Sequence, residues 1–461
     1  MTTANMNITA IAINRFGLGM RPDDTLNTDP KKWLLSQFEQ YQVRPSAWQN
    51  QAKSSDLIAE FAKNQMEMRN ADNVEKKSAQ RLFRRSARDN YVSAVNAQAE
   101  AALRTPTPFI ERLVHFWSNH FAISVEKPAV IDLVGAFELE AIRPYVLGNF
   151  KDLLLAVEQH PTMLLYLDQA KSIGPNSRAA SRLAGREPDK KHGLNENLAR
   201  EIMELHTLGV RSGYTQADVT EFARALTGWS VAGSNHDKNV VDGANGFTFR
   251  PQFQEPGSRT IIGKTYAQTG KAQGDAILAD LASAQATAMH ISTKLARHFV
   301  SDTPPPSLID KLAQTFITSK GNLNSVYRTL IDAPEAWQPA SVKFKTPWEW
   351  LISCTRGLGR QNLDGINIVQ MLNQLGQPVW KPGSPAGYDD IAETWAAPNA
   401  LLRRVKLAQR LAALSQIDAR NLADKLLLGA VSKQTLMAIS RSESATTGLA
   451  LLLVSPEFLR R

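Results

Sequence analysis

Along most of the chain, apolar residues recur at intervals of three and four positions, with helix-forming residues between them and Pro or Gly at the breaks. This spacing places apolar side chains on one face of an α-helix. Asp29-Pro30 predicts the start of one such helix, because Asp can cap a helix and Pro fits its first turn. The pattern therefore predicts a mainly α protein, a multi-helix, bundle-like array. Helices are expected over residues 56–103, 108–121, 130–148, 150–159, 195–209, 215–228, 272–283 and 286–300, and from 306 to the end.

The segment 243–266 departs from this periodicity. Phe247, Phe249 and Phe253 have the even spacing of extended chain, Pro256-Gly257 is typical of a turn, and residues 260–262 are β-branched. These features predict a small β-hairpin, inserted between helices around 245–265.

The length of 461 residues, 43% of them hydrophobic, provides ample material for a large core and favours more than one packed region. We expect an N-terminal helical region at 1–105 and a central helical core at 106–340, which holds the hairpin and the motif helices. A C-terminal helical region at 341–461 is expected to pack on that core. No internal repeat is visible, which disfavours a helical solenoid.

Composition and motifs exclude several classes of protein. No apolar run approaches the roughly 18 residues of a membrane span, so none is expected. The N-terminus lacks a basic segment followed by an apolar one, which predicts a cytoplasmic location. The single cysteine, Cys354, excludes an intrachain disulfide and a cysteine metal cluster. Neither a GxGxxG nor a GxxxxGK[ST] motif is present to support a nucleotide site.

The net charge of +9 could attract polyanions, but the basic residues are mostly interleaved with acidic ones. The exceptions are Arg81 to Arg88 and residues 171–191. The first is interpreted as a solvated basic helix face, and nucleic-acid binding is not expected, for want of a motif and of a continuous basic stripe.

The expected helix over 195–208 is the strongest candidate for chemistry. In a regular helix Asn197, Glu201 and Glu204 share one face, with Arg200 beside it and Glu196 one turn away. Arg200 joins these three as a candidate catalytic residue, and Glu196 is a candidate substrate-binding residue. Two adjacent carboxylates either bind a hard cation or hold one proton between them for general acid catalysis. Alternatively, they pair with Arg200 on an exposed helix, or form a buried ion-pair network.

A second polar segment is His115-Phe-Trp-Ser-Asn-His120. Residues five apart on a helix lie about 140° from each other, so the two imidazoles do not chelate one metal from a regular helix. His115 shares a face with Asn119, whereas His120 adjoins Trp117, and we consider Trp117 and Asn119 as substrate-binding residues. Against this aromatic surface His120 is a candidate general base, and the alternative is a core histidine bonded to a backbone carbonyl.

Histidines close to the polar motifs raise the question of a metal. His115, His120, His160 and His206 together could form a site of imidazole and oxygen ligands for a divalent metal, open among zinc, iron, copper, manganese and magnesium. No spacing among them establishes such a site.

The Pro/Gly-rich segment 377–395 carries Trp380, Tyr388 and Trp395. Aromatic rings on a stiff loop can stack on the faces of sugars, and they can equally pin a long loop to a core. Trp380 and Tyr388 are therefore candidate substrate-binding residues.

Several segments together carry a family resemblance. They are RFGLG at 15–19, HFWSNHF at 115–121, HPTMLLYLD at 160–168, NENLAREIMELHTLGV at 195–210, GYTQADVTEFARALTGW at 213–229, QPVWKPGSPAGY at 377–388 and SPEFLRR at 455–461. They span nearly the whole chain in order, and the chain is identified by them as a member of the bacterial domain-of-unknown-function family numbered eighteen hundred. The resemblance implies no agreed activity. Genes of that family often neighbour those of hydrolases similar to alkaline phosphatases or sulfatases, which implies such a hydrolase as a partner. Relatives commonly carry His-Asp where this chain has Gln254-Glu255, so a histidine role there is in doubt.

Three functional hypotheses result. The first is an enzyme built on Asn197, Glu201, Glu204 and His120, acting on a carbohydrate-like or phosphorylated substrate with a divalent metal or a carboxylate pair. The second is a non-catalytic helical scaffold or chaperone for the neighbouring hydrolase. The third is redox chemistry at a histidine-rich metal centre, which lacks the Glu-x-x-His pairs of di-iron bundles.

Overall fold

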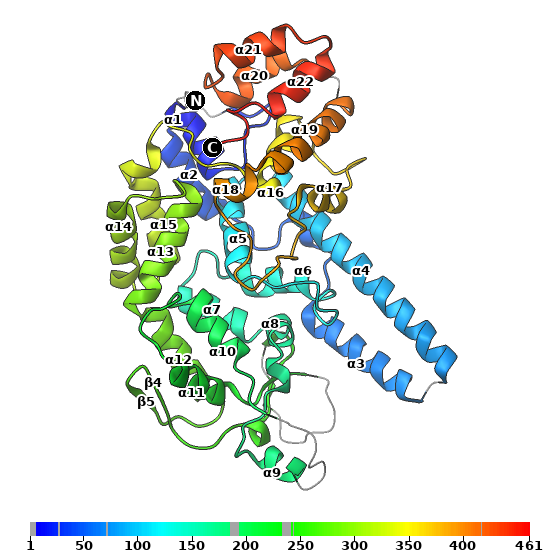
Figure 1. Cartoon of the computed structure of the whole chain (residues 1–461), viewed down its shortest axis with the longest axis vertical. Coiled ribbons are helices and arrows are strands. Elements are labelled where there is room, and N and C mark those ends of the chain that lie inside the picture. The colour runs from blue at the N-terminus through cyan, green and yellow to red at the C-terminus, as the bar shows by residue number, and fades with distance from the viewer. Residues whose placement is uncertain are drawn as a thin grey trace.

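The computed structural model describes residues 6–25, 28–70, 72–184, 193–232, 241–242, 244–415 and 417–461. The last part of the basic segment 171–191, from residue 185 on, therefore lies outside the described residues. The expected mainly α fold is confirmed, and Figure 1 shows the helices packed around a central α5. The α-helices are α1 (Ile8–Ala10), α2 (Pro30–Gln40), α3 (Ser54–Asn70), α4 (Asn73–Arg104), α5 (Pro108–His120), α6 (Val134–Phe137), α7 (Phe150–Glu158), α8 (Pro161–Tyr166), α9 (Arg178–Ala184), α10 (Asn197–Glu201), α11 (Gln216–Leu226), α12 (Lys271–Ser283), α13 (Gln285–Phe299), α14 (Pro306–Thr318), α15 (Leu323–Asp332), α16 (Pro347–Gly357), α17 (Ile368–Leu375), α18 (Ala392–Trp395), α19 (Pro398–Ala413), α20 (Ala419–Leu427), α21 (Lys433–Ser440) and α22 (Ala445–Leu453). The π-helices are η1 (Ile11–Phe16), η3 (Glu138–Ile142) and η5 (Ile202–His206), and the 3₁₀ turns are η2 (Ser46–Trp48), η4 (Gln169–Lys171), η6 (Ala244–Gly246), η7 (Pro251–Phe253) and η8 (Pro334–Trp337).

The helix starts follow local chemistry. Asp29 caps α2 by accepting a 2.9 Å hydrogen bond from the Lys32 N–H, with Pro30 in the first turn. The single helix expected over 56–103 is two helices, because Asp72 and Glu75 form a capping box that starts α4. Figure 1 shows α3 and the first half of α4 projecting from the body as a hairpin, which carries the exposed Arg81 to Arg88 segment.

The strands are β1 (Trp229–Val231), β2 (Val241–Asp242), β3 (Phe247–Phe249), β4 (Arg259–Ile261) and β5 (Lys264–Tyr266). The expected hairpin is β4–β5, and it lies later in the chain than its predicted start. β3 instead pairs antiparallel with β1 and β2 in a second sheet of order β1-β3-β2. Burial explains this pairing, since Phe247 and Phe249 are both buried and Phe247 meets Trp229 edge to face.

One continuous cluster of buried side chains extends from Met6 to Leu459 and includes residues from all three predicted regions. The division at 105 and 340 stays a prediction. Within the described residues, no helix combines the length and the apolar composition needed to cross a bilayer.

Candidate functional site

A polar cavity of about 300 Å³ lies where α5, α13, the start of α16 and the loop 377–391 meet. The side chains that line it include four histidines, two cations and three carboxylates, which are His115, His120, His290, His298, Lys294, Arg297, Glu349, Asp389 and Asp390. This density of ionisable groups in one hollow makes it the candidate functional site.

One face of α13 forms a polar wall of the cavity. His290, Lys294 and His298 follow each other at intervals of four residues, and Arg297 lies beside them. The opposite face of the helix buries Ala288 and Phe299 in the core, so packing of the apolar side turns the polar side toward the cavity.

The buried His298 and the partly buried Asp390 form a hydrogen-bonded pair. The distance between His298 Nδ1 and Asp390 Oδ2 is 2.6 Å, and the Lys343 ammonium lies 3.0 Å from Asp390 Oδ1. Burial lowers the pKa of His298 more than Asp390 raises it, so the imidazole is neutral near neutral pH. Burial alone would raise the pKa of Asp390, but His298 and Lys343 outweigh it and hold that carboxyl ionised. His298 Nδ1–H therefore donates to Asp390, while Nε2 keeps a free lone pair and has no hydrogen-bond partner among the described residues.

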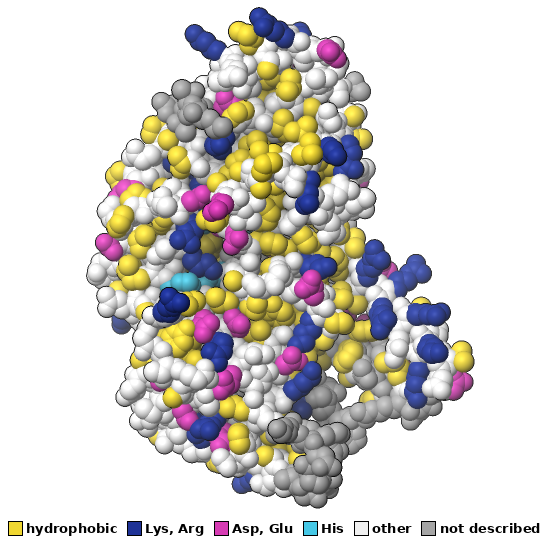
Figure 2. Space-filling model, viewed as in Figure 1, with side chains coloured by type: hydrophobic (Ala, Val, Ile, Leu, Met, Phe, Trp, Pro, Cys, Tyr) yellow, Lys and Arg dark blue, Asp and Glu magenta, His cyan; other side chains and the backbone are white. Residues whose placement is uncertain are grey.

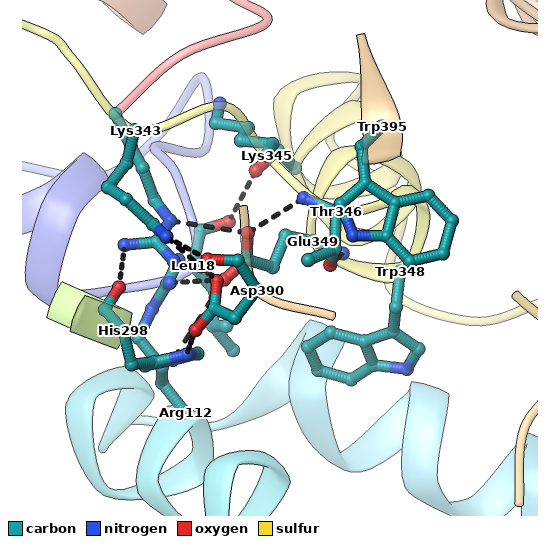
Figure 3. Close-up of polar contacts among 12 residues, drawn as sticks. Leu18, Arg112, His298, Lys343, Lys345, Thr346, Trp348, Glu349, Asp390 and Trp395 are labelled. Carbon is teal, nitrogen blue, oxygen red and sulfur yellow. Dashed lines mark hydrogen bonds and ion pairs between the residues drawn. The ribbon is translucent and has the colours of Figure 1, made fainter. Parts of the chain in front are cut away.

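Glu349 also lines the cavity, and Figure 3 shows it among the side chains that form the polar contacts of this region. Its Oε1 accepts hydrogen bonds from Arg112 at 2.5 Å and from Arg461 at 2.8 Å, and all three side chains are buried. Although burial would raise the pKa of Glu349, Arg461 and Arg112 hold it well below the usual range. Arg461 also donates to the backbone carbonyl of His298 at 2.7 Å. This network joins α5, α16 and the segment around Arg461 behind the His298–Asp390 pair.

The other three histidines are held in fixed orientations. The His115 ring stacks on Trp348 with 4.0 Å between ring centroids, and burial lowers its pKa to about 3. His120 Nε2–H donates to the His206 carbonyl at 3.2 Å, which leaves its Nδ1 unpartnered. His290 bonds to the Leu205 carbonyl at 3.0 Å, and burial lowers its pKa to about 4. All three are therefore neutral near pH 7.

The aromatic loop closes the cavity opposite α13. Tyr388 and Asn119 form two hydrogen bonds, from the Tyr388 N–H at 2.7 Å and to its carbonyl at 2.9 Å. Gly387, the residue before Tyr388, has φ +81°, and a Cβ there would lie 2.3 Å from the Asn119 carbonyl oxygen. Only glycine therefore permits the loop to pack this closely against Asn119. Asn119 and Tyr388 line the cavity, whereas Trp380 is buried in the core, and substrate binding by the first two stays a prediction.

The carboxylates predicted to share a face of the 195–208 segment do not line the polar cavity. The α-helix α10 ends at Glu201 and continues as the π-helix η5, which changes the angular spacing of the side chains after Glu201. Asn197 is exposed, and of this segment only Leu205 lines the polar cavity.

Arg200 and Glu196 belong to a surface network. Arg200 contacts Glu204 at 3.5 Å, Glu196 at 3.1 Å and the Gln216 side chain at 2.8 Å, while Glu196 accepts a hydrogen bond from Thr220. These contacts hold α10 against α11, which is the ion-pairing alternative considered for this motif. Glu201 is half-buried, and burial raises its pKa.

Trp117 also lies away from the cavity. Its side chain is fully buried, and its Nε1–H donates to the Tyr327 hydroxyl at 2.6 Å. Its place is in the core, where its large apolar surface stabilises the packing of α5.

The four predicted metal ligands are not brought together. His115 and His120 line the cavity, whereas His160 pairs with Glu140 at 3.1 Å and His206 with Glu158 at 2.7 Å. His160 also caps α8 through Nδ1, so its role is local. Within the described ranges, no group of three or more His, Cys, Asp or Glu side chains is arranged to hold a metal ion.

Sequence reasoning missed Lys294, Arg297, His298, Glu349 and Asp390. Two signals were present. The residues 290, 294, 297 and 298 repeat with helical period, and Thr346 and Glu349 match the capping box that starts α16. Neither signal reveals that these segments meet.

The ion pairs of α10 offer a test of its structural role. Because the Glu204 and Arg200 side chains are partly exposed to solvent, Glu204→Gln is expected to lower the free energy of unfolding by less than about 1 kcal/mol. Urea denaturation would measure this, with Glu443→Gln, at an exposed residue outside the network, as the reference. A loss of several kcal/mol would show that the pair carries more than surface packing.

Comparison with known protein families gives one match, which covers nearly all of the chain. The model of a family described as "Protein of unknown function (DUF1800)" matches residues 11–460. No curated protein and no solved structure matches the chain.

Proposed function

The chain belongs to the DUF1800 family, whose description states no activity, and we propose that it is an enzyme that uses the His298–Asp390 pair for general acid–base catalysis. The observation that carries this proposal is a neutral imidazole that lines a cavity, with Nδ1 bound to a carboxylate and Nε2 without a hydrogen-bond partner in the described part of the chain, 4.0 Å from Glu349 Oε1. The proposal keeps the enzyme hypothesis from the sequence but assigns the roles of the histidine and the carboxylate to His298 and Asp390.

In this proposal His298 Nε2 accepts a proton from a water molecule or a substrate hydroxyl, and later returns it. Asp390 fixes the tautomer and stabilises the imidazolium that forms. Lys343, bound to Asp390 and at 2.7 Å to Asp302, keeps the Asp390 carboxylate ionised and in place. His120 Nδ1 is a second unpartnered acceptor at the cavity and can bind a substrate hydroxyl.

An unbiased activity screen tests the proposal. The wild-type protein and His298→Asn would each be incubated with a bacterial metabolite extract, which is then compared by mass spectrometry. We expect at least one metabolite to be consumed by the wild type at a rate about 10²-fold or more above that of the variant, the usual contribution of a general base. Identical metabolite profiles for the two proteins would contradict an enzymatic role for this pair.

A scaffold for a partner hydrolase is the second candidate. The observation that favours it is the projecting α3–α4 hairpin, on which Met66, Val74 and Leu82 are exposed. Exposed apolar side chains on a protruding element are typical of protein contacts. The alkaline-phosphatase-like partner and the cytoplasmic location stay predictions.

A further inference from the structure

The charges around the cavity are unevenly paired. Each buried carboxylate at its wall already has cationic partners, since Glu349 binds Arg112 and Arg461, and Asp390 binds Lys343 as well as His298. The remaining carboxylate, Asp389, is exposed and accepts a hydrogen bond from Thr394.

The two cations of α13 have no such partners. Within the described residues, neither Lys294 nor Arg297 forms a salt bridge or a side-chain hydrogen bond, although both line the cavity. They lie one helical turn apart, so they reach the same region of the cavity. Burial lowers the pKa of Lys294 to about 8, which leaves it mostly protonated at neutral pH. On the face in Figure 2, a histidine side chain lies in a hollow with Lys or Arg side chains on either side.

From these positions we infer that Lys294 and Arg297 bind a phosphate or sulfate group of the substrate. A guanidinium offers a planar pair of donors that matches such oxyanions, and an ammonium adds a point charge with three donors. The imidazole nitrogens His120 Nδ1 and His298 Nε2 accept hydrogen bonds, so they suit hydroxyl donors of the same molecule.

The inference deepens the proposed function, and it rests on that function in one respect: the bound molecule is a substrate only if the protein is the proposed enzyme. It selects a phosphorylated or sulfated polyhydroxyl compound over the neutral carbohydrate that the sequence left equally open. A neutral sugar would cover the partly buried Lys294 ammonium without supplying a counter-charge, which costs binding free energy.

Anion binding by the whole protein tests the inference without any need for an activity. Isothermal titration with inorganic phosphate, and separately with sulfate, is expected to give one site with a dissociation constant of about 1 mM or below. Lys294→Met/Arg297→Met is expected to weaken binding by about tenfold or more, because two charge-assisted contacts are lost. Arg297→Met alone, at an exposed position, provides a variant whose folding is not at risk and is expected to give part of this loss.

Two controls locate the site and separate the two proposals. Lys151→Met, at an exposed lysine of α7 outside the cavity, is expected to bind phosphate like the wild type, and His298→Asn is expected to retain binding too. No saturable binding of either anion, or equal binding by the wild type and the double variant, would overturn the inference. If the wild type binds phosphate but has the same metabolite profiles as His298→Asn, the acid–base proposal is contradicted and the anion-binding inference is not.

Discussion

Asp390→Asn is expected to lower kcat by about 10²- to 10⁴-fold with little change in KM, because the amide can neither fix the tautomer of His298 nor stabilise its imidazolium. Once a substrate is known, steady-state kinetics would measure the effect. Folding is expected to persist, since Lys343 keeps its ion pair with Asp302 in the variant.

The pH dependence of the same variant separates a catalytic pair from a structural one. The active form of His298 is the neutral imidazole, so the acidic limb of kcat/KM follows the pKa of His298 in the free protein. Burial lowers that pKa and Asp390 raises it, so removal of the carboxylate lowers it further. The acidic limb of Asp390→Asn is therefore expected at lower pH than that of the wild type. A limb that does not move, or moves to higher pH, would contradict the assignment of the base.

The second large effect is on stability. Glu349→Gln is expected to lower the free energy of unfolding by about 3–5 kcal/mol, because Arg112 and Arg461 would remain buried without their counter-charge. Urea denaturation monitored by tryptophan fluorescence would measure the loss. The wild type should also lose stability as the pH falls through the depressed pKa of Glu349, whereas the variant lacks this contribution.

Two further variants assign the cause of that loss. Glu335→Gln removes a carboxylate whose ion pair with Lys311 is at the surface, and should cost less than about 1 kcal/mol. The triple replacement Arg112→Met/Glu349→Leu/Arg461→Met removes all three charges, and is expected to cost less than Glu349→Gln alone. A triple variant less stable than the single one would mean that the contacts themselves, and not an unpaired charge, hold this region together.

Some residues of the cavity are predictable from the sequence. His115, His120, Asn119 and Tyr388 were chosen from their own segments, and all four line it. The prediction that Glu201 and Glu204 share a face assumes an unbroken α-helix, whereas the π-helix η5 changes the number of residues per turn after Glu201. Trp117 lies in the core and not at the cavity. An aromatic residue on a polar segment can face either a ligand or the core, and its spacing in the sequence does not distinguish the two.

What the sequence determined by itself is local. Helix positions, the cap at Asp29 and the mainly α class follow from contacts between residues within a few positions of each other, which the order of residues encodes directly. Only the tertiary structure decided that His298 meets Asp390, and that Glu349 lies between Arg112 and Arg461. Such pairs are separated by many elements of the chain, and the packing of helices on a shared core determines which of many buried charges become neighbours.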